Sequence, residues 1–270
     1  LSVTQVETWM RDPYAIYARK ILDLEALDPL DADPGAADYG TVIHDILDRF
    51  VRAYPEALPE NAQDILYAFG QEHFAELLRR PGPRAFWWPK FLRIADWFLA
   101  LEAERRPLLA QSVTETWGYL TLDGHAGPFR IKAKADRIDR HKTGRITLID
   151  YKTGATPTET EVAAGFAPQL PLEAAMARAG GFDGIAPGPL ESLEYWKLMG
   201  RDVAGKRTLL KGDPEALADQ ALEGVGGLIR AFDDPATPYE ARPRPDAAPR
   251  YSDYEHLARI AEWATAEDTQ

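Results

Sequence analysis

The sequence predicts an α/β protein in which helices flank a central β-sheet. Apolar and polar residues alternate in Val113–Leu122, in 129–136 and in 146–152, which is typical of strands. Apolar residues recur at helical spacing in 40–51 and in 214–232, which predicts amphipathic helices before and after these strands. We therefore expect one sheet built from the middle of the chain, with helices packed against it.

Composition limits the class of protein. A chain of 270 residues with 45% hydrophobic residues and seven tryptophans is long enough for one large domain with a real core. The absence of cysteine excludes disulfides, thiolate zinc sites and iron–sulfur clusters bound by cysteine. The sequence contains no run of eighteen apolar residues and no signal-peptide pattern, so we expect a cytoplasmic protein. Because the sequence begins at Leu1, we also expect a fragment of a longer protein.

Residues 1–110 are expected to form a helical elaboration. Gly40 is expected to open a helix that carries His44 at the rim of its apolar face. Asp48, one turn after His44, is one geometric option for a hydrogen-bond partner of the imidazole. Bases and aromatic residues mix in Arg84–Arg93, which can indicate stacking on single-stranded nucleic acid. We favour the alternative, in which these aromatic side chains belong to the core or to a subunit interface.

The stretch from Asp136 to Lys152 is expected to form two strands joined by a turn at Thr143–Gly144. In the second strand Asp150 and Lys152 have the same parity, so their side chains emerge on one face about 7 Å apart. A carboxylate can hold a hard divalent cation, and an ammonium group beside it can orient or activate a water molecule. This arrangement of two aspartates and a lysine therefore indicates a metal-dependent phosphodiesterase.

The strands before Asp150 add further polar side chains. In 129–136 the apolar positions alternate with Arg130, Lys132 and Lys134, so one face is basic and ends at Asp136. For Asp136 alone, a strand-end aspartate that caps a turn is the alternative to a metal ligand. Glu115 can face the site as an accessory acid, but we favour a solvated strand glutamate at that position.

The net charge of −12 is unusual for a protein that acts on nucleic acid. Phosphate contacts need a local basic surface rather than a positive whole chain. Between Pro128 and Lys152 eight Lys and Arg residues stand against three Asp residues, a local excess of five positive charges. We therefore expect a basic face around the site, with a partner supplying most of the affinity for DNA.

Three motifs give these residues a family resemblance. Asp136 followed by the stretch Asp150–Gly154 resembles the D…DYKTG signature of RecB-like nucleases in the PD-(D/E)XK superfamily. Gly40–His44 resembles the upstream G-x-x-x-H helix of that family, and Gln169–Leu172 resembles its downstream Q-x-x-L helix. The resemblance implies the restriction-endonuclease-like fold, an α/β fold with a mixed central sheet flanked by helices.

The resemblance also implies roles for individual residues in the hydrolysis of DNA phosphodiesters. The ligands that it implies for Mg²⁺, with Mn²⁺ as an alternative ion, are His44, Asp136, Asp150 and the carbonyl of Tyr151. The catalytic residues that it implies are Asp136, Asp150, Lys152 and Gln169. Lys152 is expected to act as a cation rather than a base, because the reference pKa of lysine is about 10.4. For Gln169, simple capping of its helix is the competing account.

The sequence departs from the family pattern at two positions. Related nucleases often carry the first cysteine of an iron–sulfur cluster near the N-terminus, and this chain has Asp12 there. With no cysteine anywhere in the chain, the cluster cannot form. The family usually has a tyrosine after the leucine of Q-x-x-L, and this chain has Glu173.

Within the superfamily the chain is most similar to the C-terminal nuclease domain of AddB-type subunits of helicase–nuclease complexes, over essentially its whole length. This resemblance implies an exonuclease of double-strand break repair and recombination, associated with the nucleoid. It implies DNA as the substrate, single strands in particular, and an AddA-like helicase–nuclease subunit as the partner. No membrane partner is expected.

We expect one integrated nuclease domain with three parts. These parts are a helical elaboration over 1–110, the core sheet with the Q-x-x-L helix over 111–200, and a C-terminal helix with a wrapping tail over 201–270. Two other functions stay open. One is a catalytically silent nuclease fold that binds DNA or docks a partner, and the other is a stand-alone RecB-like exonuclease.

Overall fold

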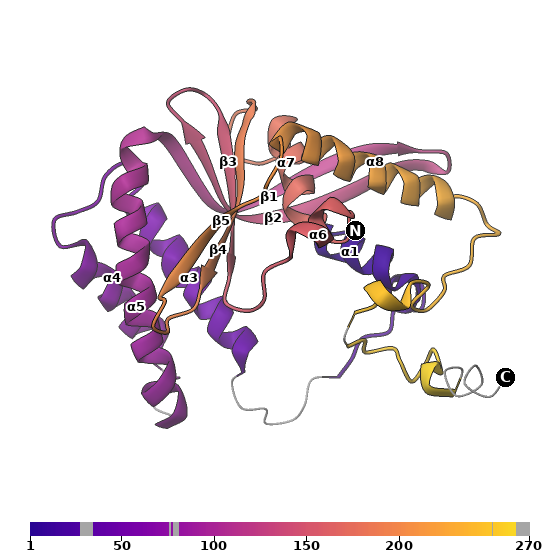
Figure 1. The fold of residues 1–270 in the computed structure, drawn as a ribbon, viewed down its shortest axis with the longest axis horizontal. Helices are drawn as coiled ribbons and strands as arrows, with labels where there is room; N and C mark the ends of the chain where they lie inside the picture. Colours follow the sequence, from indigo (N-terminus) through magenta and orange to yellow (C-terminus); the bar gives the residue numbers. More distant parts are fainter. Residues whose placement is uncertain (28–34, 76, 78–80, 250, 263–270) are drawn as a thin grey trace.

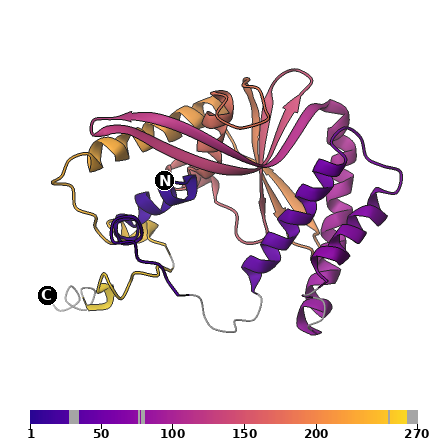
Figure 2. The same cartoon turned by 180° about the vertical axis from the view of Figure 1, so that it is seen from behind.

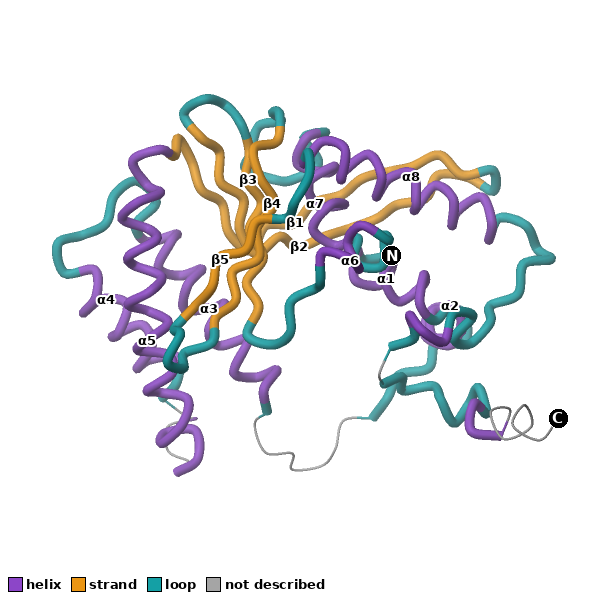
Figure 3. Tube along the Cα trace, in the orientation of Figure 1, coloured by secondary structure: helices purple, strands orange, loops and turns teal. Residues whose placement is uncertain are grey.

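A computed structural model describes residues 1–27, 35–75, 77, 81–249 and 251–262. Figure 1 shows the fold, and Figure 3 separates helices from strands along the same trace. The helices are α1 (Val3–Arg11), α2 (Pro13–Lys20), α3 (Ala36–Ala53), α4 (Ala62–His73), α5 (Pro81–Arg105), α6 (Glu159–Ala163), α7 (Gln169–Arg178) and α8 (Pro214–Phe232), with short 3-10 turns at Arg106–Leu108 and Pro245–Ala247. The strands are β1 (Leu109–Gly124), β2 (Gly127–His141), β3 (Ile146–Lys152), β4 (Leu190–Leu198) and β5 (Gly205–Leu209).

The five strands form one mixed sheet in the order β1-β2-β3-β4-β5. Only β3 and β4 pair in parallel, and each other neighbouring pair is antiparallel. The expected hairpin around Thr143–Gly144 is confirmed, because β2 and β3 pair on either side of that turn. The predicted α/β fold with a mixed sheet and flanking helices is therefore confirmed. The sheet also gains β5, which the sequence did not predict and which lies beyond residue 200; the division of the domain at 110 and 200 stays a prediction.

Helices cover both faces of the sheet (Figure 1). Helices α1, α7 and α8 pack on one face, where Ile131, Leu148 and Val225 belong to one buried cluster, the first core. Helices α3, α4 and α5 pack on the other face, where Phe50 and Tyr151 belong to the second core. Neighbouring residues of β3 point to opposite faces. The face of Leu148 therefore also receives Asp150 and Lys152, beside α7.

The β1–β2 hairpin extends well beyond the other strands (Figure 2). Its ladder continues without a break to Gly124 and Gly127, while β3 pairs with β2 only as far as Arg137. The loop at the tip is held by Asp233 after α8, whose carboxylate accepts the backbone N–H groups of His125 and Ala126 at 2.6 and 3.2 Å. The extension is therefore tied to α8 at its far end.

The hairpin is irregular at one cross-strand position. The ladder pairs Thr114 with Arg137 and Thr116 with Ala135, so Glu115 lies opposite Asp136. Glu115 has a φ of 49°, which few residues other than glycine adopt and which costs free energy. On β2, Ala135 faces the first core, whereas Arg137 contacts residues of the second core. The alternation of side chains between the two faces of the hairpin is therefore interrupted at Glu115 and Asp136.

The helix that carries His44 begins earlier than the sequence predicts. We expected it to open at Gly40, but α3 begins at Ala36, and Asp38 in its first turn accepts the backbone N–H of Gly35 at 2.7 Å. Gly40 serves packing instead of helix initiation. A Cβ there would lie 2.9 Å from the Thr153 hydroxyl, so a larger residue would require the Thr153 side chain to move away from α3.

The aromatic residues of α5 support the core interpretation of Arg84–Arg93. Phe91 and Phe98 are fully buried in the second core, and Trp87 and Trp88 pack against its edge. Phe86 alone is largely exposed among these rings, with 68% of its surface accessible. Among the described residues, no helix is both long enough and apolar enough to span a bilayer.

Asp12 joins the two ends of the chain. Its carboxylate caps α2 by accepting the backbone N–H of Ala15 at 3.3 Å and accepts the Ser252 hydroxyl at 3.0 Å. The backbone N–H of Tyr14 donates to the carbonyl of Glu240 at 3.2 Å. Polar contacts therefore hold the C-terminal segment against α1 and α2. Residues 263–270 of the predicted tail lie outside the described part.

Candidate active site

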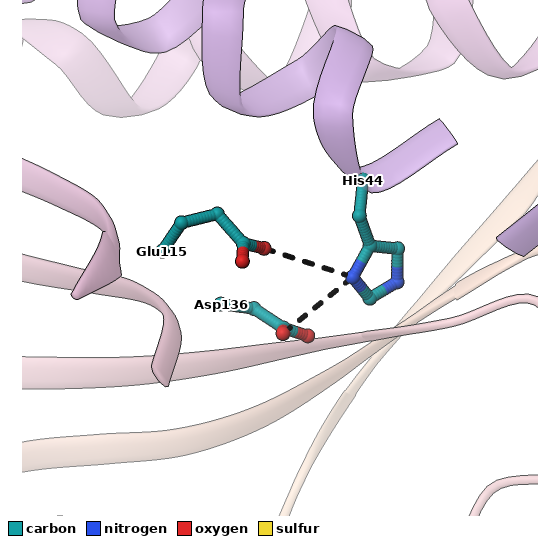
Figure 4. A group of neighbouring side chains, drawn as sticks. All are labelled: His44, Glu115 and Asp136. Atoms are coloured by element: carbon teal, nitrogen blue, oxygen red, sulfur yellow. Dashed lines mark ion pairs between the residues drawn. The ribbon is translucent and has the colours of Figure 1, made fainter. Parts of the chain in front are cut away.

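Three elements bring an imidazole and two carboxylates together. His44 comes from α3, Glu115 from β1 and Asp136 from β2 (Figure 4). The His44 Nδ1 atom lies 3.5 Å from an Asp136 oxygen and 3.9 Å from a Glu115 oxygen. One potential ligand atom from each residue lies within 4.8 Å of the others. All three side chains are partly buried, so the group is accessible from solvent while its charges are partly desolvated.

Asp136 also fixes the point at which β2 leaves β3. Its second oxygen accepts the backbone N–H of Tyr151 at 2.7 Å, just after the β2–β3 ladder ends at Arg137 and Ile149. A residue in an antiparallel pair directs its N–H and C=O toward the same neighbour. The carbonyl of Tyr151 is therefore directed toward β2 and Asp136.

A second polar group surrounds Asp150. The Lys152 ammonium donates to Oδ1 of Asp150 at 2.9 Å, and the Gln169 amide donates to the same oxygen at 3.0 Å. The other oxygen, Oδ2, lies 2.8 Å from the Lys152 nitrogen but receives no hydrogen bond of acceptable geometry from the described residues. Asp150 is almost fully buried, so Oδ2 is a buried carboxylate oxygen that can accept a further hydrogen bond.

The two groups are neighbours that interact through their charges. Burial raises the pKa of Asp150 to about 7, the charge of Asp136 adds to this rise, and Lys152 and His44 oppose it. Asp150 is not among the three residues whose ligand atoms lie within 4.8 Å of one another. The electrostatic coupling nevertheless indicates that a cation between Asp136 and Asp150 would relieve their mutual repulsion.

The carboxylates of the site favour the charged forms of its basic side chains. Burial lowers the pKa of Lys152, but the carboxylates of Asp150, Asp136 and Glu173 outweigh burial and raise it above its usual value. Burial likewise lowers the pKa of His44, and the hydrogen bond and charge of Asp136 outweigh it, so this pKa is also raised. Without a cation in the site, the carboxylates thus favour an imidazolium and an ammonium.

The structure places the predicted residues in two adjoining clusters. His44 and Asp136 meet in one, and Asp150, Lys152 and Gln169 meet in the other. Asp48, one option for a hydrogen-bond acceptor of the His44 imidazole, instead accepts from Arg52 at 2.7 Å. The roles assigned to the site residues stay predictions.

Two acidic residues of the site were underestimated from the sequence. We favoured a solvated side chain for Glu115, but Glu115 belongs to the same cluster as His44. The register of the β1–β2 hairpin could have predicted this position. Counting back from a two-residue loop at His125–Ala126 pairs Glu115 with Asp136 directly. Glu173 is buried and accepts from the Gln169 amide at 3.2 Å, and burial raises its pKa well above the usual range.

The donor atoms fit a hard divalent cation. Carboxylate and carbonyl oxygens, which make up most of the donor atoms here, suit Mg²⁺ and Mn²⁺. The unsatisfied oxygen of Asp150 and the close carboxylates of Glu115 and Asp136 are the features that a bound cation would stabilise. Residues that could bind it are therefore His44, Glu115, Asp136, Asp150 and the carbonyl of Tyr151.

The predicted basic face is smaller than the charge count suggests. Arg137 is fully buried and pairs with Glu102 and Asp139, and Arg145 pairs with Glu191. Arg140 donates to the backbone carbonyl of Ala186 at 2.8 Å. The basic side chains that remain exposed on β2 are those of Arg130, Lys132 and Lys134.

Comparison with known proteins identifies the family of the chain. Residues 1–254 match the family described as the PD-(D/E)XK nuclease superfamily. An uncharacterized protein of Rickettsia bellii is 33% identical over 68% of this chain, and uncharacterized protein RC0550 of Rickettsia conorii is 32% identical over 67% of it. In both cases the match covers 22% of the relative, so the chain spans about a fifth of their length. A solved structure described as the crystal structure of SSO0001 aligns with 78% of this chain and 84% of its own at 13% identity and a TM-score of 0.28, and this likeness carries no argument.

Proposed function

The chain belongs to the PD-(D/E)XK nuclease superfamily, and from this premise we propose that it hydrolyses DNA phosphodiesters with Mg²⁺ or Mn²⁺. The observation that carries the proposal is the convergence of His44, Glu115 and Asp136 beside the ion pair of the buried Asp150 with the partly exposed Lys152. Glu115 has a strained backbone conformation beside His44 and Asp136, and Asp150 is buried in the adjoining cluster, and a scaffold without activity has no need for either cost. The arrangement therefore favours an enzyme over a silent DNA-binding fold.

The proposed cation site uses residues from both clusters. His44, Asp136, Asp150 and the carbonyl of Tyr151 would hold the ion, and Glu115 is a further ligand beside His44. A divalent cation bound there lowers the pKa of a coordinated water and offsets the charge that develops at phosphorus. To bind it, His44 must give up the proton that the surrounding carboxylates favour.

Lys152 and Gln169 act differently in this proposal. Lys152 remains an ammonium, so it donates hydrogen bonds to a phosphate oxygen or to the attacking water and does not act as the general base. Gln169 spans Asp150 and Glu173 with its amide group, donating to both. It therefore holds the Asp150 carboxylate in one orientation, which makes it a positioning residue.

The biological setting is a finer proposal that rests on the motifs. The G-x-x-x-H, D…DYKTG and Q-x-x-L motifs favour an AddB-type exonuclease of double-strand break repair and recombination at the nucleoid. In that setting an AddA-like helicase–nuclease subunit delivers single strands to the site. Co-purification of the full-length protein with such a subunit is the test, and a full-length protein that degrades DNA efficiently without one would favour the stand-alone exonuclease.

Metal-dependent digestion tests the central proposal. We expect end-labelled DNA to be degraded in the presence of Mg²⁺ or Mn²⁺, and we expect EDTA to abolish the reaction, because the cation supplies several kcal/mol of charge stabilisation. Single-stranded and double-stranded substrates are compared by gel electrophoresis of the products. Cleavage that persists in EDTA would contradict the metal dependence, and a full-length complex that cuts no DNA with either metal would support the scaffold.

Metal affinity is expected to depend on pH. Burial and the charge of Asp136 raise the pKa of Asp150 to about 7, and this carboxyl must be ionised to bind a cation. Lowering the pH from 8 to 6 is therefore expected to weaken Mn²⁺ binding by about tenfold through Asp150 alone. The raised pKa of His44 adds a further loss in the same direction.

Isothermal titration calorimetry with Mn²⁺ at pH 6, 7 and 8 measures this dependence. Measurements in buffers of different ionisation enthalpy also count the protons released on binding. Replacing His44 with Gln should reduce that count, because one titrating ligand is lost. An affinity that is constant between pH 6 and 8 would show that neither Asp150 nor His44 gives up a proton to the ion.

A further inference from the structure

The outer face of the β1–β2 hairpin carries aromatic and basic side chains in register. Cross-strand neighbours are Trp117 with Lys134, Tyr119 with Lys132 and Thr121 with Arg130. Side chains directly opposite one another in an antiparallel pair lie on the same face. Trp117 and Tyr119 are 44% and 39% exposed, which is unusual for large rings on a strand.

The opposite face of the same hairpin is fully used for packing. Gly118 and Ala133 form the next cross-strand pair, and a Cβ on Gly118 would collide with the ring of Phe182. Ala133 is buried in the first core, and Leu120 packs against it. The hairpin therefore already has its hydrophobic support, and the rings of Trp117 and Tyr119 are not needed to anchor it.

Cations lie over both exposed rings. The Arg130 guanidinium carbon is 4.0 Å from the centre of the Tyr119 ring, and the Lys132 nitrogen is 5.6 Å from the centre of the Trp117 ring. Among the described residues, neither cation has a carboxylate within ion-pair distance. These charges are therefore available to phosphates, while a ring or a guanidinium plane offers a flat surface to a base.

The outer face leads directly to the candidate active site. Continuing the register inward from Trp117 and Lys134, the next pair on this face is Glu115 with Asp136, and Lys134 pairs with Glu115. Asp136 lies six positions after Arg130, which is about 20 Å along an extended strand. That length accommodates several nucleotides, because one strand of a duplex advances about 3.4 Å per nucleotide.

We propose that Trp117, Tyr119, Arg130 and Lys132 form a binding track for single-stranded DNA that guides the strand to the cation site. Alternating cations and exposed rings match a chain whose phosphates need charge and whose bases need stacking partners. A duplex fits less well, since its base faces are already stacked on one another. The proposal rests on the proposed nuclease function and extends it by assigning the β1–β2 hairpin as the element that binds and selects the single strand.

Binding in the absence of metal tests the track separately from cleavage. The probes are a fluorescein-labelled thymidine 20-mer and the corresponding duplex, measured by fluorescence anisotropy in EDTA. Replacing Trp117 or Tyr119 with alanine is expected to weaken single-strand binding by about tenfold, and replacing both by about a hundredfold. Phenylalanine at the same positions should restore most of the affinity, because stacking is retained. Duplex binding should change far less.

Matched controls separate the track from general effects. Phe86, a more exposed ring on α5, is replaced with alanine, and Lys206 on β5 serves as the control for Lys132. The Lys132→Ala variant should reduce the salt dependence of single-strand binding by about one phosphate contact, and Lys206→Ala should not. Hydrolysis of bis-p-nitrophenyl phosphate, a diester too small to reach the track, should be unchanged in the ring variants.

Each remaining outcome either overturns the proposed track or supports it. Equal single-strand binding by the parent and the double ring variant overturns the proposal, as does the absence of measurable binding by the parent. If the ring variants bind DNA like the parent but no longer bind a purified helicase subunit, the proposal is also overturned. The outer face then binds a protein partner. If DNA is bound through the rings but is not cut with any metal, the track stands and the proposed nuclease function fails.

Discussion

Replacing Asp150 with asparagine is expected to reduce DNA cleavage by roughly 10³-fold or more. Asparagine keeps the shape of the side chain but removes the charge that the cation and Lys152 require. An amide also presents one acceptor oxygen where the carboxylate presents two, so the unsatisfied oxygen available to a cation is lost. Cleavage rates of end-labelled single-stranded DNA under single-turnover conditions measure the effect without a contribution from product release.

The same substitution should leave the metal-free protein folded. The pKa of Asp150 is raised to about 7, which means that its environment favours the neutral form over the charged one. A neutral asparagine at this position should therefore unfold at the same temperature as the parent or at a higher one, near pH 8 without metal. The matched control is Asp123→Asn on the exposed end of β1, which should cut at the parental rate. A fully active Asp150→Asn protein would remove Asp150 from the site.

The local sequence was sufficient to predict strands, turns and helices that one hydrophobic period defines. The turn at Thr143–Gly144 and the helix over 214–232 were predicted with the boundaries that the structure has, because alternation and helical spacing are local properties. The motifs also located His44, Asp136, Asp150, Lys152 and Gln169 within one region of the fold. Strand parity was enough to predict the contact between Asp150 and Lys152, because both residues lie on the same strand.

Features that depend on distant parts of the chain were missed. The start of α3 was misplaced because Gly40 looked like a helix opener, whereas its role is close packing against Thr153, more than a hundred residues away. Glu115 was undervalued because its partner Asp136 is set by the register of the whole hairpin. Arg137 was counted as part of a basic surface, and only the fold reveals that it is completely buried.

Arg137 supports the second large expected effect. Its guanidinium lies among fully buried acids, pairing with Glu102 of α5 and donating to Asp139 on its own strand at 2.7 Å. Asp139 also accepts from Arg105 at 2.8 Å, so strand β2 and helix α5 share one buried network of charges. Removing one partner from such a network leaves an uncompensated charge in the interior.

Replacing Arg137 with methionine is therefore expected to lower the free energy of unfolding by about 3–5 kcal/mol. For a chain of this size the loss corresponds to a fall in Tm on the order of 10 °C. Methionine keeps most of the apolar volume of the arginine stem, so the effect reports the charge rather than a cavity. Urea denaturation followed by tryptophan fluorescence gives the free energy, and thermal unfolding gives the Tm.

The network explanation makes two comparisons decisive. Arg140→Met, three residues along the same strand, removes an arginine whose guanidinium donates to backbone carbonyls at the surface, and it should cost less than about 1 kcal/mol. Glu102 also accepts from the buried Arg106 at 2.8 Å, so adding Glu102→Leu to Arg137→Met removes the excess negative charge but leaves Arg106 without its partner. The double variant should therefore be less stable than Arg137→Met, but by less than Glu102→Leu alone costs in the parent. If the double variant is instead less stable than Arg137→Met by the full cost of a second core substitution, the two side chains are not coupled. The buried charges would then stabilise this part of the fold only through the volume that they fill.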